Sequence, residues 1–527
     1  MRLSLFLNNK PTAMILRKAF IFSFIFVCSV TLLAQADLQK LDEYIAKAQA
    51  EWNVPGIAVA IVKDGKVVLS KGYGVLEAGK DQPVDANSLF AIASNTKAFI
   101  ASSIGTLVDQ GKIGWKDKVR DYLPYFELYD NYASSEATIE DLLSHRLGLG
   151  TFSGDVIWYK SNLSAEDVVK RAKFVPQAYG FRDGYGYSNL MFITAGEVIK
   201  AVTGKEWHEY VQETFFGPLE MGRTITSTES LSNTNNYATP HKAIRDENLV
   251  IDWAKWDNMG AAGGIISSAN DMAKWMNFQL MGTSEPSSVL AKETQNLIWT
   301  PHNSYTVSES QKLAKPGRNF NSYALGWGVS DKDGRRIIAH GGGYDGMYSR
   351  VAMMPEENLG IVVLTNGMRG ISNVITDYVM DAYIGAPTVD HSKAALSSMS
   401  YAMYDRIDNI KSKRVKGTKP SLSSREYAGI FYTPMYGDIY VKEEAGKLRL
   451  EFSHAPLLSA TLEHWHYDTF EVKWEQEHAW FGFGTVQFNF DAQRNIQGIR
   501  IDVPNDDIFF HELDLKKINS PKTTQGR

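Results

Sequence analysis

Four consecutive residues, Ser94-Asn95-Thr96-Lys97, form the first group in this sequence whose types and spacing allow chemistry. They are the only Ser-x-x-Lys in the chain, and the mostly apolar segment 98–110 that follows them predicts a buried helix. Residues three apart share one face of a helix, so Lys97 can reach the Ser94 hydroxyl. A buried lysine loses its proton more readily and can serve as the base for a serine nucleophile. Alone the pair is a weak signal, because serine and lysine are common.

A tyrosine and an asparagine in a glycine-rich segment form the second candidate group. Tyr187 and Asn189 lie in the segment 184–190, just before an apolar stretch, 190–202, that predicts another helix. A phenol near lysine cations can ionise below its usual pKa of about 10 and pass protons. The amide of Asn189 can orient the acyl part of a substrate. Both side chains are therefore candidates for acyl-transfer chemistry.

The third group is the run His340-Gly341-Gly342-Gly343, which closes the strand-like segment 336–339. Glycines at a strand edge let a substrate backbone lie close to the protein. The N–H group of Gly343 could join that of Ser94 in an oxyanion hole. By itself His340 would more often be a structural histidine, and only its place after the other two groups makes it a candidate.

The order Ser-x-x-Lys, Tyr-x-Asn, His-x-Gly resembles the serine β-lactamase and penicillin-binding superfamily. The resemblance is closest to its class C-like branch, which contains penicillin-binding esterases, DD-peptidases and D-aminopeptidases. The intervals of 93 residues from Ser94 to Tyr187 and 153 from there to His340 suit that branch. Further phrases that resemble it lie at 141–148, 216–222, 262–268 and 326–328, so the resemblance covers residues 37–385.

The resemblance implies an acyl-enzyme mechanism that needs no metal or cofactor. Ser94 would attack an acyl carbonyl, while Lys97 and Tyr187 take and return the proton. The N–H groups of Ser94 and Gly343 would hold the oxyanion. The remaining candidate substrate-binding residues are Asn189, His340 and Gly342.

One departure from most β-lactamases bears on the substrate. Those enzymes have a lysine where this chain has His340, and a lysine is always charged, whereas a histidine is only partly charged near pH 7. The family uses histidine there mainly in DD-peptidases, D-aminopeptidases and esterases. The resemblance therefore implies a hydrolase of peptides, amides or esters. A class C-like β-lactamase and a non-catalytic binder of penicillin or cell-wall peptide remain the alternatives.

Composition excludes several other functions. Among 527 residues, 55 Lys and Arg stand against 60 Asp and Glu, a net charge of −5, so no overall electrostatic attraction to nucleic acid or anionic membrane exists. The single cysteine, Cys28, lies in a segment that we expect to be removed. Disulfides, a cysteine nucleophile and thiolate zinc sites are then excluded together. The expected partner is a small-molecule or peptide substrate, with cell-wall peptide as one candidate, and the oligomeric state stays open.

The N-terminus has the pattern of an export signal. Arg17 and Lys18 precede an apolar run, 19–34, that ends in Ala34-Gln35-Ala36, a small-x-small cleavage site. The run is shorter than the roughly 20 residues of a membrane span. We therefore expect residues 1–36 to be a signal peptide cleaved after Ala36, with Met1 or Met14 as the start. The product would be periplasmic or secreted, without a stable membrane anchor.

The rest of the chain predicts two domains. Strand-like segments at 56–62, 66–69, 325–329, 336–339, 349–354 and 360–364 surround helical patterns, which indicates a layered α/β or α+β domain. The resemblance implies that residues 37–390 form a β-lactamase/transpeptidase-like domain with an antiparallel sheet and a helical part. Residues 391–424 are the expected linker. Short alternating segments in 425–515 predict a small antiparallel barrel or sandwich, and 516–527 a disordered tail.

Overall fold

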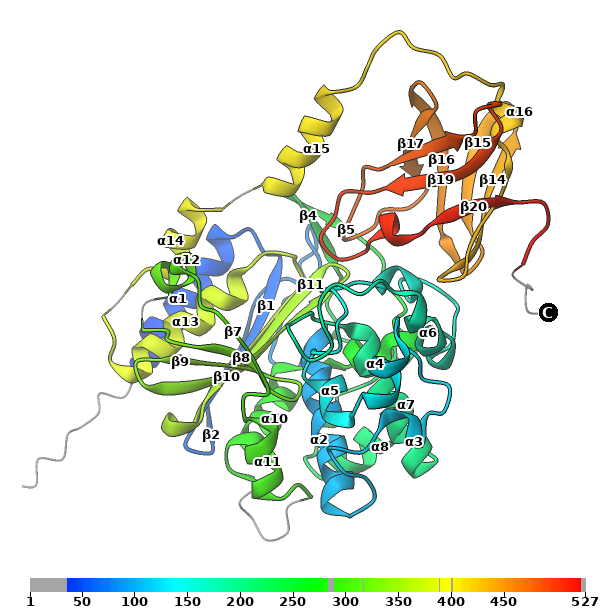
Figure 1. Ribbon diagram of the computed structural model, residues 1–527. Helices are drawn as coiled ribbons and strands as arrows, with labels where there is room; N and C mark the ends of the chain where they lie inside the picture. The colour runs from blue at the N-terminus through cyan, green and yellow to red at the C-terminus, as the bar shows by residue number, and fades with distance from the viewer. Residues whose placement is uncertain (1–35, 283–288, 316, 388, 400, 523–527) are drawn as a thin grey trace, which may run out of the picture. The chain divides into compact units, whose positions relative to one another are not determined.

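The computed structural model describes residues 36–282, 289–315, 317–387, 389–399 and 401–522 (Figure 1). The expected signal peptide, apart from Ala36, and residues 523–527 of the expected tail lie outside the described residues. Within the described ranges, no helix combines the length and the apolar character needed to cross a membrane.

An eight-stranded antiparallel sheet forms the centre of the first domain. Its strand order is β2-β1-β12-β11-β10-β9-β8-β7. In this order the strands are β2 (Lys66–Gly74), β1 (Gly56–Lys63), β12 (Leu359–Thr365), β11 (Met347–Met354), β10 (Arg335–Tyr344), β9 (Gly328–Lys332), β8 (Asn321–Tyr323) and β7 (Asn303–Tyr305). The hairpin formed by β1 and β2 thus joins the later strands in one sheet, as Figure 1 shows.

Helices cover both faces of this sheet, because its central strands are apolar on both sides. In β1, Ile57, Val59 and Ile61 pack in the cluster that contains residues of α1 (Leu38–Glu51) and α13 (Ile371–Ile384). The alternate residues of β1 pack on the opposite side, against α10 (Ala269–Leu280) and the other helices of the large cluster. This two-residue alternation is what a strand buried on both faces requires.

The helical part packs around one almost completely buried helix, α2 (Thr96–Asp109), which begins two residues after Ser94. Next to it lie α7 (Asn189–Thr203) and α9 (Gly260–Gly263). The other elements of this domain are α3 (Val119–Tyr122), α4 (Asn131–Glu136), α5 (Ile139–Leu143), α6 (Ala165–Arg171), α8 (Trp207–Val211), α11 (Lys292–Ile298), α12 (Glu309–Ala314), β3 (Phe90–Ala91), β4 (His241–Ile244), β5 (Glu247–Val250) and β6 (Ile266–Ser267).

The second domain is a closed antiparallel barrel of eight strands. They are β13 (Gly429–Thr433), β14 (Gly437–Glu444), β15 (Lys447–Phe452), β16 (Ala455–His466), β17 (Thr469–Trp474), β18 (Thr485–Phe490), β19 (Ile496–Asp502) and β20 (Leu515–Ile518). Pairing of β13 with β20 closes the ring and leaves no free strand edge. Buried aromatic side chains fill the interior, with Tyr427, Phe470 and Phe488 in mutual edge contact. The structure confirms the predicted fold class. Of the barrel and the sandwich expected for the second domain, the barrel is correct.

Two expected boundaries differ from the structure. The disordered tail expected at 516–527 is wrong for residues 516–518, because they complete β20 and pair with β13. The strand expected at 325–329 starts only at Gly328, since the backbone turns at Gly326, where φ is +72° and the chain packs against the Lys97 carbonyl. The described part of the segment 391–424 contains two helices, α14 (His391–Ser397) and α15 (Ala402–Ser412), and its last residue begins α16 (Ser424–Tyr427).

Candidate active site

Ser94 lies on a tight turn just before α2. The residue before it, Ala93, has φ of +47°, a conformation that costs a non-glycine residue on the order of 1 kcal/mol. The neighbouring side chain holds this turn in place: Asn95 Nδ2 donates to Ser349 Oγ at 2.9 Å, and Ser349 Oγ donates to the Ile92 carbonyl at 2.7 Å. The turn is therefore tied to β11 and presents the partly exposed Ser94 hydroxyl to the pocket.

Lys97 is fully buried behind Ser94. Its Nζ lies 3.1 Å from Ser94 Oγ, 2.8 Å from Asn189 Oδ1 and 2.7 Å from the Ala262 carbonyl oxygen. Burial lowers the pKa of Lys97 to about 7, against an opposing effect from the Asp155 charge. A neutral amine has two N–H groups and one lone pair. The two carbonyl acceptors take both N–H groups, so the lone pair faces the Ser94 hydroxyl.

Tyr187 lies beside both residues, with its ring centroid 4.8 Å from Lys97 Nζ. Burial raises the pKa of Tyr187 well above 10, and the hydrogen bond with Ser94 opposes this rise only in part. The expectation that this phenol ionises below its usual pKa is therefore wrong, because the desolvation of its anion outweighs the neighbouring cation. His145 fixes the loop: its Nδ1 accepts the Ser188 N–H at 3.0 Å, and its ring packs 4.4 Å from that of Tyr187.

Asn189, the first residue of α7, connects Lys97 to a carboxyl group that the sequence reading missed. Its Oδ1 accepts from Lys97, and its Nδ2 donates to Asp155 Oδ2 at 2.7 Å. Asp155 is buried, and its Oδ1 accepts the Trp158 indole N–H at 2.8 Å. Burial raises the pKa of Asp155 to about 8. No local pattern marks this residue, which lies in the loop-rich segment before α6.

His340 is buried on β10 and neutral. Its Nδ1 lies 2.6 Å from the Gly341 carbonyl and must donate there, so Nε2 accepts the Tyr323 hydroxyl at 2.8 Å. Burial, helped by the Lys97 charge, lowers the pKa of His340 to about 3. The expectation of a partly charged histidine near pH 7 is therefore wrong, and this position supplies no positive charge to a substrate.

The glycines after His340 allow β10 to lie against the Ser94 turn. A Cβ atom on Gly342 would sit 2.3 Å from both the Ile92 carbonyl oxygen and Ser349 Oγ, so a side chain would push the strand away. Pairing of β10 with β9 ends at Ala339 in the described part of the chain. Gly342 and Gly343 lie beyond that residue, in the part of β10 next to the Ser94 turn, where an oxyanion hole that includes Gly343 would lie.

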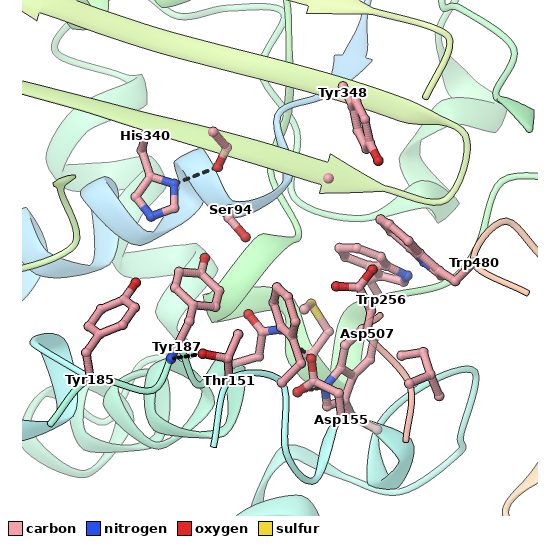
Figure 2. Close-up of a pocket in the computed structure, with 17 residues that line it drawn as sticks. Ser94, Thr151, Asp155, Tyr185, Tyr187, Trp256, His340, Tyr348, Trp480 and Asp507 are labelled. Carbon is pink, nitrogen blue, oxygen red and sulfur yellow. Dashed lines mark hydrogen bonds between the residues drawn. The ribbon is translucent and has the colours of Figure 1, made fainter. Parts of the chain in front are cut away.

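Ser94 opens into a cavity of about 440 Å³, shown in Figure 2. The expected residues Tyr187, Asn189, His340 and Gly343 line it, while Lys97 lies behind Ser94. Aromatic side chains form a large part of the wall, among them Phe152, Trp158, Tyr185, Trp256, Tyr348 and Trp480. Three of the lining residues, Trp480, Asp507 and Ile508, come from the C-terminal barrel domain, and sequence reasoning missed all three.

An antiparallel sheet covered by helices, with a serine at the head of a buried helix and a lysine hydrogen-bonded to it, defines the β-lactamase-like class of folds. Residues 41–384 match the family model described as Beta-lactamase. The protein therefore belongs to the β-lactamase family, whose members are typically serine hydrolases. Residues 413–517 match a second model, a domain of unknown function named DUF3471.

Two curated proteins are among the similar sequences. Protein flp of Staphylococcus aureus (strain N315) is 28% identical over 341 residues, 64% of this chain, and the chain spans 64% of that protein's length. Unguisins hydrolase ungD of Aspergillus violaceofuscus (strain CBS 115571) is 28% identical over 454 residues, 78% of this chain and 79% of that protein.

Solved structures share the fold. The octameric penicillin-binding protein homologue from Pyrococcus abyssi has a TM-score of 0.60 at 19% identity, over 89% of this chain and 98% of that chain. D-amino acid amidase from Ochrobactrum anthropi SV3, complexed with L-phenylalanine amide, has a TM-score of 0.53 at 22% identity, over 66% of this chain and 99% of that chain.

Proposed function

We propose that this protein is an exported serine hydrolase that forms an acyl-enzyme on Ser94 and acts on peptides, amides or esters. The observation that carries the proposal is the position of the buried Lys97, whose Nζ lies 3.1 Å from Ser94 Oγ and is held by hydrogen bonds to Asn189 Oδ1 and the Ala262 carbonyl. The β-lactamase family match and a curated relative that is named a hydrolase support the same reaction class.

In the acylation step, neutral Lys97 takes the proton of Ser94, and Ser94 Oγ attacks the acyl carbonyl carbon. The N–H groups of Ser94 and Gly343 stabilise the oxyanion that forms. The protonated phenol of Tyr187 gives its proton to the leaving amine or alcohol and recovers one from Lys97. The bond from the carbonyl carbon to the leaving group breaks, and neutral Lys97 is restored.

In the deacylation step, a water molecule takes the place of the leaving group. Lys97, acting directly or through the Tyr187 hydroxyl, accepts a proton from this water as it attacks the ester carbonyl. The ester bond to Ser94 breaks, and the proton returns to Ser94 Oγ. Asn189 orients the acyl group while it holds Lys97 in place.

The substrate class follows from the charge of the pocket. The described lining residues include no lysine or arginine, and His340 is neutral. A substrate carboxylate, such as that of a penicillin, has no cationic partner there. This favours an amidase, aminopeptidase or esterase over a β-lactamase. For the location of the protein, we propose cleavage after Ala36 and a periplasmic or secreted product, on the signal pattern of residues 1–36.

Intact-protein mass spectrometry tests the proposal. Residues 37–527 are incubated separately with a fluorophosphonate and a penicillin, with Ser94→Ala as the control. We expect a stable fluorophosphonate adduct that is absent from Ser94→Ala, and slow or no acylation by penicillin. Rapid penicillin turnover would establish the β-lactamase alternative. No adduct with either compound would favour a non-catalytic binder.

A further inference from the structure

The residues that lead from α15 into the barrel carry a concentrated positive charge. We call residues 411–419 the basic segment, since five of its nine residues are cations: Lys411, Lys413, Arg414, Lys416 and Lys419. No acidic residue lies between 409 and 425. The segment runs along the outside of the barrel towards α16, as Figure 1 shows, and it does not line the cavity in front of Ser94. It therefore has no part in the proposed reaction.

Arg414 fixes the basic segment to strand β16 of the barrel. Its Nε donates to the Trp465 carbonyl at 2.9 Å, and its Nη2 donates to the His464 carbonyl at 3.0 Å. The guanidinium also lies 4.6 Å from the centroid of the Trp465 ring, which is buried. A planar guanidinium that bonds two carbonyl groups and stacks on an aromatic ring is held in one position. The segment is therefore a built part of the barrel surface.

Two apolar side chains are exposed beside these cations. The Val415 N–H donates to His466 Nδ1 at 3.2 Å, and the Tyr467 N–H donates to Thr418 Oγ1 at 3.0 Å. Residues 415–418 thus lie next to the turn between β16 and β17, which contains Tyr467. Val415 is 42% exposed and Tyr467 is 56% exposed. The turn and the segment together present an aliphatic and an aromatic side chain within a cationic surface.

The lysines of the basic segment have no counter-charge in the protein. In the part of the chain that the structure describes, three of these exposed side chains make no hydrogen bond or ion pair: Lys413, Lys416 and Lys419. Two acids beside the segment are already engaged, since Asp408 pairs with Arg245 at 2.8 Å and Asp468 accepts the Ser421 N–H at 2.9 Å. The net charge of −5 does not cancel this patch, because charges beyond about 8 Å are largely screened at physiological salt.

A cationic surface with an exposed valine and tyrosine fits an anionic lipid bilayer. Each lysine or arginine near an anionic membrane surface strengthens binding about fivefold, and apolar and tyrosine side chains enter the headgroup region. Nucleic acid would use the cations but would gain nothing from the valine. We propose that the basic segment and the β16–β17 turn form a docking surface that holds the protein reversibly on a bilayer of anionic phospholipids. This inference does not depend on the chemistry at Ser94.

Co-sedimentation with vesicles tests the proposal. Residues 37–527 are mixed with vesicles of phosphatidylglycerol and phosphatidylcholine in equal parts, and separately with vesicles of phosphatidylcholine alone. At a salt concentration of about 0.05 M we expect the protein to bind the anionic vesicles at least about tenfold more tightly than the zwitterionic ones. This binding should be lost at about 0.5 M salt, because the Debye length then falls to about 4 Å.

The test variant combines Lys413→Gln, Lys416→Gln and Lys419→Gln. The matched control combines Lys66→Gln, Lys112→Gln and Lys447→Gln, three exposed lysines outside the basic segment, so that both variants lose the same charge. We expect the test variant to bind anionic vesicles about 100-fold more weakly, from about fivefold for each lysine, and the control to bind like wild type. Thermal melting curves of both should match wild type, because every replaced side chain is exposed.

A second variant, Val415→Ser with Tyr467→Asn, tests the apolar part of the surface. Asparagine suits the turn, because residue 467 has φ of +47°. We expect this variant to keep its preference for anionic vesicles and to bind them several-fold more weakly, since less apolar surface enters the headgroup region. Arg414 is left unchanged because it holds the segment in place.

The outcomes decide the proposal without reference to labelling of Ser94. Equal binding to the two kinds of vesicle, or binding to neither, overturns it. So does a lysine variant that binds within about threefold of wild type, a control variant that loses as much binding, or a Val415→Ser/Tyr467→Asn variant that binds like wild type. A duplex DNA fragment that binds as tightly as the anionic vesicles, through the same three lysines, would make the segment a nucleic-acid site and would also overturn it.

Discussion

Replacing Lys97 tests the general base of the proposed mechanism. The structure lowers the pKa of this lysine from 10.5 to about 7 by burial. The neutral, basic form is present above that pKa and lost below it. About one Lys97 in eleven is then neutral at pH 6 and about ten in eleven at pH 8, so the rate at which a fluorophosphonate labels Ser94 should rise about tenfold over that range.

Two variants isolate the base. Lys97→Met keeps a long apolar stem without the amine, and Lys97→Arg keeps a charge that is always present. Both should lower the labelling rate about 100- to 10,000-fold, the range for loss of a general base, and abolish the pH dependence between 6 and 8. Lys112→Met, at an exposed lysine beyond the C-terminal end of α2, is the control and should behave like wild type.

The assay is labelling of residues 37–527 followed by intact mass at several times and pH values. A wild-type rate that stays flat from pH 6 to 8 would refute the assignment of Lys97 as the titrating base. A Lys97→Met rate within about tenfold of wild type would refute its role in catalysis. Thermal melting curves of each variant show whether a loss of rate reflects a loss of folded protein.

Three further predictions concern the surroundings of the site. Gly342→Ala should cost about 1–3 kcal/mol of folding free energy by overpacking and should slow the labelling of Ser94. Gly222→Ala, where a Cβ meets nothing within 4 Å, is the control and should change neither quantity. Urea unfolding measures the free energy, and the labelling rate of Ser94 measures the effect on the site. Glu512→Gln should weaken the contact between the barrel and the Asp155 loop by about 1–3 kcal/mol in urea unfolding; an unchanged midpoint would contradict this. In the unfolded chain Lys97 keeps its proton up to its ordinary pKa of 10.5, whereas in the folded protein it loses the proton above about pH 7. The unfolding free energy of wild type relative to Lys97→Met should therefore rise with pH above about 7, by at most about 1.4 kcal/mol per pH unit. A difference that is constant from pH 7 to 9 would contradict this prediction.

Local spacing was enough to predict some of the site. Ser94 and Lys97 are three residues apart at the start of a helix, so the sequence alone brings them together. Tyr187 and His340 are far away along the chain, and only the family resemblance places them beside Ser94. Their ionisation could not be predicted in the same way, because it depends on burial. Asp155 and Asp507 were missed for a related reason: no motif surrounds them, and only tertiary packing brings them to the cavity.

The fold, like the site, was predictable where its signals are local and not where it depends on tertiary contacts. Apolar runs predicted strands at 56–62 and 66–69, which form the β1–β2 hairpin, since an apolar run is a local signal. Barrel and sandwich could not be separated, because the difference depends on whether β13 meets β20. That contact joins residues 430–432 to 516–518, almost ninety residues apart, at the position where the sequence predicted a tail. Two lysines and a single apolar residue near the chain's end carry too weak an alternation to predict a closing strand.

A lysine that acts as a general base must be neutral, and the state of the nearby acid bears on whether it is. Among the described residues, Asp155 is the carboxyl whose charge raises the pKa of Lys97, and burial keeps Asp155 itself largely protonated at neutral pH. The Asp507 charge raises the pKa of Asp155 and of Tyr187. Because Asp507 comes from the barrel, a change in the barrel loop alters the electrostatic surroundings of these two groups.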